Sequence, residues 1–167
     1  VNPMTAYGMI EEAGLQAGQW LLLTAGASAF GKFAIQMAKA KGIRVAATVR
    51  HESQKELLLD LGAELVINTS TEKLAKVIFE KTEVGVDVVF DAVGGELGVK
   101  ALSCLKQKGR MLVFGALALE NLSINSGLLI FKNLRIEGFW LSTWIEELSA
   151  EQRMKAFQRV FGFLMQD

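Results

Sequence analysis

The sequence predicts an α/β fold: a doubly wound parallel sheet of about six strands with helices on both faces. Two observations support this prediction. Short runs rich in β-branched and apolar residues alternate with stretches of helical period, and several of these runs are apolar almost throughout, as expected where helices cover both faces of a sheet. The predicted strands are Gln19–Ala25, Ile43–Val49, Leu65–Asn68, Val86–Asp91, Gly109–Gly115 and Leu134–Phe139.

Four other stretches have the period of amphipathic helices, and a further helix is implied between the fourth and fifth strands. We expect the apolar side of each helix to be buried. The large aromatic side chains of the last helix imply a substantial partner surface, for which packing in the core of this chain is the simplest interpretation. The helices and their apolar positions are Gly31–Lys41 (Phe30, Ala34, Met37, Ala38), Glu52–Leu61 (Leu57, Leu58, Leu61), Glu72–Lys81 (Leu74, Val77, Ile78) and Ala150–Met165 (Met154, Phe157, Phe161, Leu164).

Composition bounds the class of protein. The chain has 167 residues, 51% of them hydrophobic, and no repeat or linker, so one domain with its own core is expected. The chain begins at Val1 rather than at a methionine, and its first residues already have the pattern of ordered structure, which suggests a segment excised from a longer protein. Eighteen basic and eighteen acidic residues cancel without clustering, so we expect a small-molecule ligand and neither a nucleic-acid nor a membrane partner.

Targeting and thiol chemistry add little. Apolar runs such as Trp20–Leu23 are far shorter than the ~20 residues that span a bilayer, and no signal-like segment is present, so a cytoplasmic protein is expected. A single cysteine, Cys104, and a single histidine, His51, allow no internal disulfide and no structural zinc cluster. We expect Cys104 to be a small core residue, the alternative being a reactive thiol.

A turn of small residues joins the first strand to the first predicted helix. Gly26 lets the chain turn sharply, Ser28 and Ala29 let the backbone approach a pyrophosphate, and Gly31 lets the helix pack closely on the strand. The free N–H groups at the helix start would then face two phosphates. The pattern lacks the middle glycine of G-x-G-x-x-G, but the flanking strand and helix give it the context of a Rossmann-type dinucleotide site. The alternative is a tight turn that binds no nucleotide.

The end of the second strand indicates which dinucleotide is bound. NAD sites usually place an acidic residue there for the ribose 2′-hydroxyl, whereas NADP sites supply a cation for the 2′-phosphate. Here the strand ends in Arg50 with no acidic residue, and a guanidinium favours bidentate phosphate contacts. His51, Ser53 and Lys55 are further candidate donors. The sequence therefore predicts NADP(H), the alternative being that Arg50 and Lys55 are ordinary surface charges.

With these motifs in place, the whole chain resembles the cofactor domain of the medium-chain dehydrogenase/reductase superfamily, in its zinc-free quinone-reductase branch. Asn2–Ala6 is similar to that branch's Asn-Pro-x-Thr-Ala segment, and Val86–Gly95 matches its fourth strand and loop. Ile130–Ser142 resembles the subgroup of trans-2-enoyl thioester reductases, which also accepts serine at the position of Ser28. Zinc alcohol dehydrogenases place a cysteine ligand where this chain has Val1, so the resemblance implies no metal.

The resemblance also implies positions around the coenzyme. Ala29 and Phe30 replace the family's commoner glycine and valine, which makes the turn bulkier and is expected to weaken coenzyme binding. Phe139 and Trp140 could instead be packing aromatics, and turn geometry alone favours Gly94 and Gly115. The implied residues are Thr5 near the nicotinamide, Gly26, Ser28, Ala29, Phe30 and Gly31 at the pyrophosphate, Arg50 and Lys55 at the 2′-phosphate, Val93 and Gly94 beside the adenosine ribose, Phe114, Gly115 and Ala116 under the nicotinamide ribose, and Phe139, Trp140 and Leu141 at the carboxamide.

The implied activity is hydride transfer from NADPH to an activated C=C bond of a quinone, enone or 2-enoyl thioester. Residues 1–167 would be the dinucleotide-binding domain, and the catalytic GroES-like domain would lie outside this chain together with any proton donor. We therefore assign no catalytic residue, and we interpret Tyr7 as structural. The alternative function is a nucleotide-binding module without turnover.

The last predicted strand bears on assembly. It places Leu134, Ile136 and Gly138 on one face, and Arg135, Glu137 and Phe139 on the other. In the family this edge pairs with its twin across a two-fold axis, so the resemblance implies a homodimer. The alternative is that the charged residues keep the edge monomeric.

Overall fold

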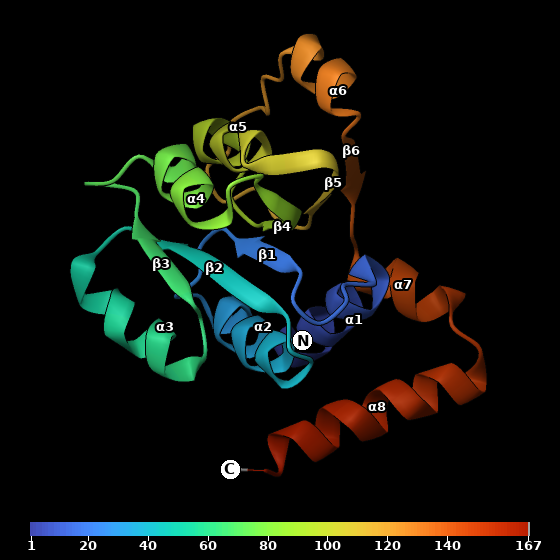
Figure 1. Cartoon of the computed structure of the whole chain (residues 1–167). Helices are drawn as coiled ribbons and strands as arrows, with labels where there is room; N and C mark the ends of the chain where they lie inside the picture. Colours follow the sequence, from blue (N-terminus) through green and yellow to red (C-terminus); the bar gives the residue numbers. More distant parts are fainter. Residues whose placement is uncertain (167) are drawn as a thin grey trace.

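The sheet is entirely parallel, as predicted. In the computed structural model, which describes residues 1–166, six strands lie in the order β3-β2-β1-β4-β5-β6 (Figure 1). The chain extends from β1 to one edge and then from β4 to the other, which is the doubly wound topology. The strands are β1 (Trp20–Leu23), β2 (Arg44–Val49), β3 (Leu65–Asn68), β4 (Val86–Asp91), β5 (Leu105–Val113) and β6 (Arg135–Gly138).

Helices cover both faces of this sheet, as Figure 1 shows. Side chains of α1, α2 and α3 pack on one face, and those of α4, α5 and α6 pack on the other. Leu22 of β1, flanked by Ala46 of β2 and Val89 of β4, is fully buried between the layers. The helices are α1 (Asn2–Ala13), α2 (Ala29–Ala40), α3 (Lys55–Leu61), α4 (Leu74–Thr82), α5 (Gly95–Ser103), α6 (Ser126–Lys132), α7 (Leu141–Glu147) and α8 (Ala150–Leu164).

Strand β5 begins at Leu105, before the predicted Gly109. Leu105 pairs with Val86, and the register shifts before Val88 pairs with Arg110. The shift coincides with a polar stretch in which Lys108 has a left-handed φ of 62°. This stretch therefore has the composition of a turn although the strand continues through it.

Helix α1 is the main element that the sequence prediction missed. Its proline lies in the first turn, where the missing N–H costs no hydrogen bond, and Gly14 ends the helix with φ 61°. Small residues allow it to pack closely: a Cβ on Gly8 would lie 3.1 Å from both Phe139 and Trp144. Short helices α6 and α7 were also not predicted.

The expected burial of two helices was partly wrong. Leu57 of α3 is exposed, whereas Leu58 is fully buried. On α8, the small side chains of Ala156 and Val160 face α1, so the larger apolar side chains point to solvent. The exposed positions are Met154, Phe157, Phe161 and Leu164. Core packing of this stripe is therefore contradicted for the part of the chain that the structure describes. Among residues 1–166, no helix has the length and apolar character needed to cross a membrane.

Candidate functional site

The turn between β1 and α2 is built on two glycines that lack room for a side chain. The Gly26 N–H donates to the Thr48 carbonyl at 2.8 Å, and a Cβ on Gly26 would lie 2.7 Å from that of Ala47. A Cβ on Gly31 would lie 2.3 Å from the Gly26 carbonyl oxygen. Helix α2 therefore starts directly against the end of β1, which is the close packing predicted for Gly31.

Ser28 caps α2. Its hydroxyl oxygen accepts the Gly31 N–H at 3.0 Å and remains able to donate its own proton. The N–H groups of Ala29 and Phe30 have no carbonyl partner within the helix, because they belong to its first turn. Ala29 is exposed. The start of α2 thus presents main-chain donors and the positive end of a helix dipole, the arrangement that binds anions.

The Phe30 ring does not line this turn. It is buried, with its centroid 4.2 Å from that of Phe114 and 6.4 Å from that of Phe90. Only the main chain of Phe30 can face a phosphate. The bulky residue noted in the sequence is therefore accommodated in the core, where it ties the turn to the ends of β4 and β5.

Asp91, which the sequence analysis did not single out, organises the loop after β4. Its buried carboxylate accepts the Thr24 hydroxyl at 2.8 Å and the N–H groups of Val93 and Gly94, both at 3.0 Å. The Thr24 oxygen in turn accepts the Ala92 N–H at 2.9 Å. This cluster fixes the main chain after the two central strands. An acidic residue ending an apolar strand was the only signal for it in the sequence.

The segment after β5 lies against the segment after β4. The Phe114 N–H donates to the Asp91 carbonyl at 3.0 Å, and a Cβ on Gly115 would lie 2.7 Å from the Ala92 oxygen. Ala116 is exposed. The structure thus brings together the predicted positions at Gly94 and Gly115, beside the turn that carries Phe30.

The end of β2 presents three exposed predicted residues, Arg50, His51 and Ser53. Lys55 differs from them because its Nζ lies 2.7 Å from Glu72 and 3.4 Å from Glu52. The hydrogen bond between Lys55 and Glu72 raises the pKa of Lys55 and lowers the pKa of Glu72. Lys55 is thus held by carboxylates, which the sequence prediction of a phosphate donor did not anticipate.

The remaining predicted residues lie near α1 and α7. The Thr5 hydroxyl donates to the Val1 carbonyl at 3.1 Å, and the Phe139 N–H donates to the Val113 carbonyl at 2.8 Å. Trp140 is 73% exposed, and Leu141 is partly buried against the α1–α8 contact. These positions are placed together by contacts between α1 and α7.

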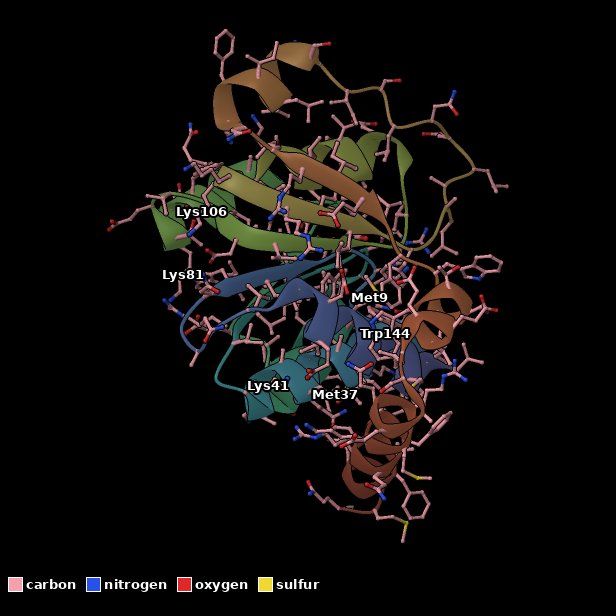
Figure 2. The ribbon with its side chains drawn as sticks, turned by 90° about the vertical axis from the view of Figure 1, so that its right-hand side faces the viewer. Met9, Met37, Lys41, Lys81, Lys106 and Trp144 are labelled. Atoms are coloured by element: carbon pink, nitrogen blue, oxygen red, sulfur yellow. The ribbon has the colours of Figure 1, made fainter. Side chains whose placement is uncertain are left out.

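Tyr7 packs edge-on against Trp144, which Figure 2 labels beside α1, with ring centroids 6.3 Å apart. Partial burial raises the pKa of the Tyr7 phenol. Its environment is that of a packing residue, as interpreted from the sequence.

A parallel sheet of this order, with a glycine-rich turn between its first strand and a helix N-terminus, defines a Rossmann-type dinucleotide-binding domain. Comparison with known families matches residues 29–157 to the zinc-binding dehydrogenase family. The chain therefore belongs to this family and corresponds to the coenzyme-binding domain of the medium-chain dehydrogenase/reductase superfamily. Within residues 1–166, no three His, Cys, Asp or Glu side chains are grouped so that they could hold a metal ion.

The relatives are reductases. The chain is 34% identical to the mitochondrial enoyl-[acyl-carrier-protein] reductase of Homo sapiens over 91% of this chain and 42% of the relative. It is 32% identical to prostaglandin reductase 1 of Bos taurus over 93% of this chain and 48% of the relative. Escherichia coli quinone oxidoreductase, solved in complex with NADPH, superposes with a TM-score of 0.88 at 29% identity, over 96% of this chain and 50% of that one. The chain spans about half the length of the curated relatives it matches.

Proposed function

We propose that this chain binds NADPH at the carboxyl edge of its sheet, as the coenzyme-binding domain of a reductase that acts on an activated C=C bond. The observation that carries the proposal is the start of α2. The N–H groups of its first turn follow directly from β1, because Gly26 and Gly31 have no side chain that would meet Ala47 or the turn's own backbone and push the helix away from the strand. This turn lies where the strand order reverses between β1 and β4, the usual position of a ligand in doubly wound sheets.

The residues present fit a dinucleotide. A pyrophosphate fits the main-chain donors of Ala29 and Phe30, with the Ser28 hydroxyl as a further donor. The loop that Asp91 fixes, with Gly94 at φ 74°, offers backbone to a ribose. Exposed Arg50 favours a coenzyme with a 2′-phosphate.

NADPH would supply the hydride, and the protein's part is to bind and orient the coenzyme. In this chain, the segments Phe114–Ala116 and Phe139–Leu141 are the proposed surfaces for the nicotinamide half. The substrate class proposed for the full-length protein is a quinone, an enone or a 2-enoyl thioester. The reductase activities named for the relatives support this class.

Isothermal titration calorimetry of the chain with NADPH and NADH tests the coenzyme assignment. We expect tighter binding of NADPH, and we expect Arg50→Ala to weaken NADPH binding by about 1.5–3 kcal/mol, the contribution of a charged hydrogen bond. Equal affinities for both coenzymes, together with an unchanged NADPH affinity in Arg50→Ala, would contradict it. NADPH consumption by the full-length protein with crotonyl thioesters, enones and quinones distinguishes a reductase from a binding module without turnover.

A further inference from the structure

Two carboxylates from different parts of the chain hold Lys55. Glu72, in the loop between β3 and α4, accepts from Lys55 Nζ at 2.7 Å, and Glu52, in a short 3-10 turn before α3, lies 3.4 Å away. The Lys55 side chain is only 23% exposed. The ammonium group is therefore paired with protein carboxylates, although Lys55 lies shortly after Arg50 in the chain, close to the end of β2.

The loop that carries Glu72 is anchored to the segment that carries Arg50. The Ser70 hydroxyl donates to the Arg50 carbonyl at 2.9 Å, and the Thr69 N–H donates to the Val49 carbonyl at 3.0 Å. Glu72 itself also accepts the Asn68 N–H at 2.8 Å. These bonds fix the position of the Glu72 carboxylate relative to the end of β2.

The charges around the end of β2 consequently cancel. Arg50 and Lys55 contribute two positive charges, and Glu52 and Glu72 contribute two negative charges. Among residues 1–166, Lys55 pairs with both carboxylates, whereas Arg50 makes no ion pair. A phosphate group at this position would meet one cation that is not already neutralised by a partner.

We infer that Glu72 is a specificity-determining residue, because it withholds Lys55 from the 2′-phosphate of the coenzyme. Discrimination between phosphorylated and unphosphorylated coenzymes then depends on Arg50 alone and stays modest. The inference rests on the proposed function, in which the chain binds NADPH with its 2′-phosphate at Arg50. Replacing Glu72 by glutamine removes the negative charge and keeps an oxygen that can accept the Asn68 N–H. Lys55 would then keep only its 3.4 Å pair with the exposed Glu52 and would become more available to the ligand.

The test is calorimetric binding of 2′-phospho-ADP-ribose and of ADP-ribose, because the dissociation constant of ADP-ribose divided by that of 2′-phospho-ADP-ribose isolates the 2′-phosphate. We expect Glu72→Gln to raise this ratio by about tenfold, the effect of one additional charge-assisted contact. Lys55→Met alone leaves Glu52 and Glu72 without their partner and should lower the ratio, whereas Lys55→Met added to Glu72→Gln should return the ratio to its wild-type value. Glu80→Gln is the matched control, since Glu80 is an exposed carboxylate of α4 paired with Lys76 at 4.0 Å. It should leave the ratio unchanged.

An unchanged ratio in Glu72→Gln would overturn the inference. If Arg50→Ala lowers the ratio but Glu72→Gln does not raise it, only the role of Glu72 is wrong; if Arg50→Ala has no effect either, the proposed coenzyme site is wrong. Thermal unfolding without ligand establishes that each variant is folded. Should Glu72→Gln not fold, Glu72→Ala takes its place, because it removes the same charge; an unchanged ratio in that variant would equally overturn the inference.

Discussion

Substituting alanine for Gly31 tests the construction of the turn most sharply. The added Cβ would lie 2.3 Å from the Gly26 carbonyl oxygen and 2.7 Å from its carbon. Ordinary contacts between carbon and oxygen are about 3.3 Å or longer, so helix and strand must separate by roughly 1 Å. The atoms it meets are backbone atoms, which cannot move aside as a flexible side chain would.

The expected free energy follows from two opposing terms. Overpacking of this kind costs about 3 kcal/mol, the upper end of the usual range, because backbone must move. Alanine regains about 1 kcal/mol of helix propensity over glycine. We therefore expect Gly31→Ala to lower the free energy of unfolding by about 2 kcal/mol, or Tm by roughly 4–8 °C for a domain of this size.

Gly162→Ala is the matched control, because Gly162 also lies within a helix but a Cβ there would meet nothing within 4 Å. That variant should be more stable than the wild type by about 0.5–1 kcal/mol. Circular dichroism during urea and thermal unfolding measures both variants. The reasoning would be refuted if Gly31→Ala were as stable as the wild type, or if the two substitutions shifted stability in the same direction.

Three further predictions concern a thiol, an ion pair and the sheet edge. Burial raises the pKa of the Cys104 thiol to about 12. A disulfide reagent at pH 8 should therefore modify Cys104 no faster than the protein unfolds, and fast modification of the native protein would contradict the core position of this residue. The hydrogen bonds from Arg110 lower the pKa of Glu137 in the folded chain below its ordinary value of 4.5. This pair therefore stabilises the folded chain above pH 4.5, and the stabilisation is lost as the pH falls through the pKa that Glu137 has in the folded chain. Glu137→Gln should thus cost about 1 kcal/mol at pH 7 and progressively less in acid, as measured by urea unfolding, whereas a pH-independent difference would be inconsistent with the ion pair. We propose a homodimer through β6. Phe139 donates its N–H to β5, so by alternation the N–H of Ile136 points to the open edge of the sheet. Ile136→Pro should therefore convert the dimer to a monomer in light scattering, and a wild-type monomer at micromolar concentration would rule out this interface.

The sequence predicted the sheet because strand periodicity is a local property. Each predicted strand occurs in the structure, and the Gly31 turn has the close packing that its residue types require. Helix α1 was missed because buried Ala6, Met9 and Ile10 are interspersed with small and polar residues, so no clear apolar stripe marks it. Local pattern therefore identified the elements that build the site better than it identified the helix beside it.

The roles of individual site residues depended on contacts between distant segments. In the sequence, Asp91 is simply the last residue of a predicted strand. Only the fold brings the Thr24 hydroxyl and the Val93 N–H to its carboxylate. From the sequence, Lys55 was predicted to be available to a phosphate, because nothing in a single sequence shows that Glu72 approaches it from the loop after β3. The exposed stripe on α8 is similar: its amphipathic pattern predicts a partner surface but does not say which side faces α1.

The central claim is that the start of α2 binds the pyrophosphate of a dinucleotide, and an NMR titration of the ¹⁵N-labelled chain with NADPH tests it most directly. The account predicts saturable shifts that are largest at the amides of Ala29 and Phe30, with smaller shifts at Gly94 and Gly115. It would be contradicted if NADPH bound but left the amides of Ala29 and Phe30 unchanged while shifts gathered at the opposite edge of the sheet, such as the cavity lined by Leu15, Gln19 and Lys106.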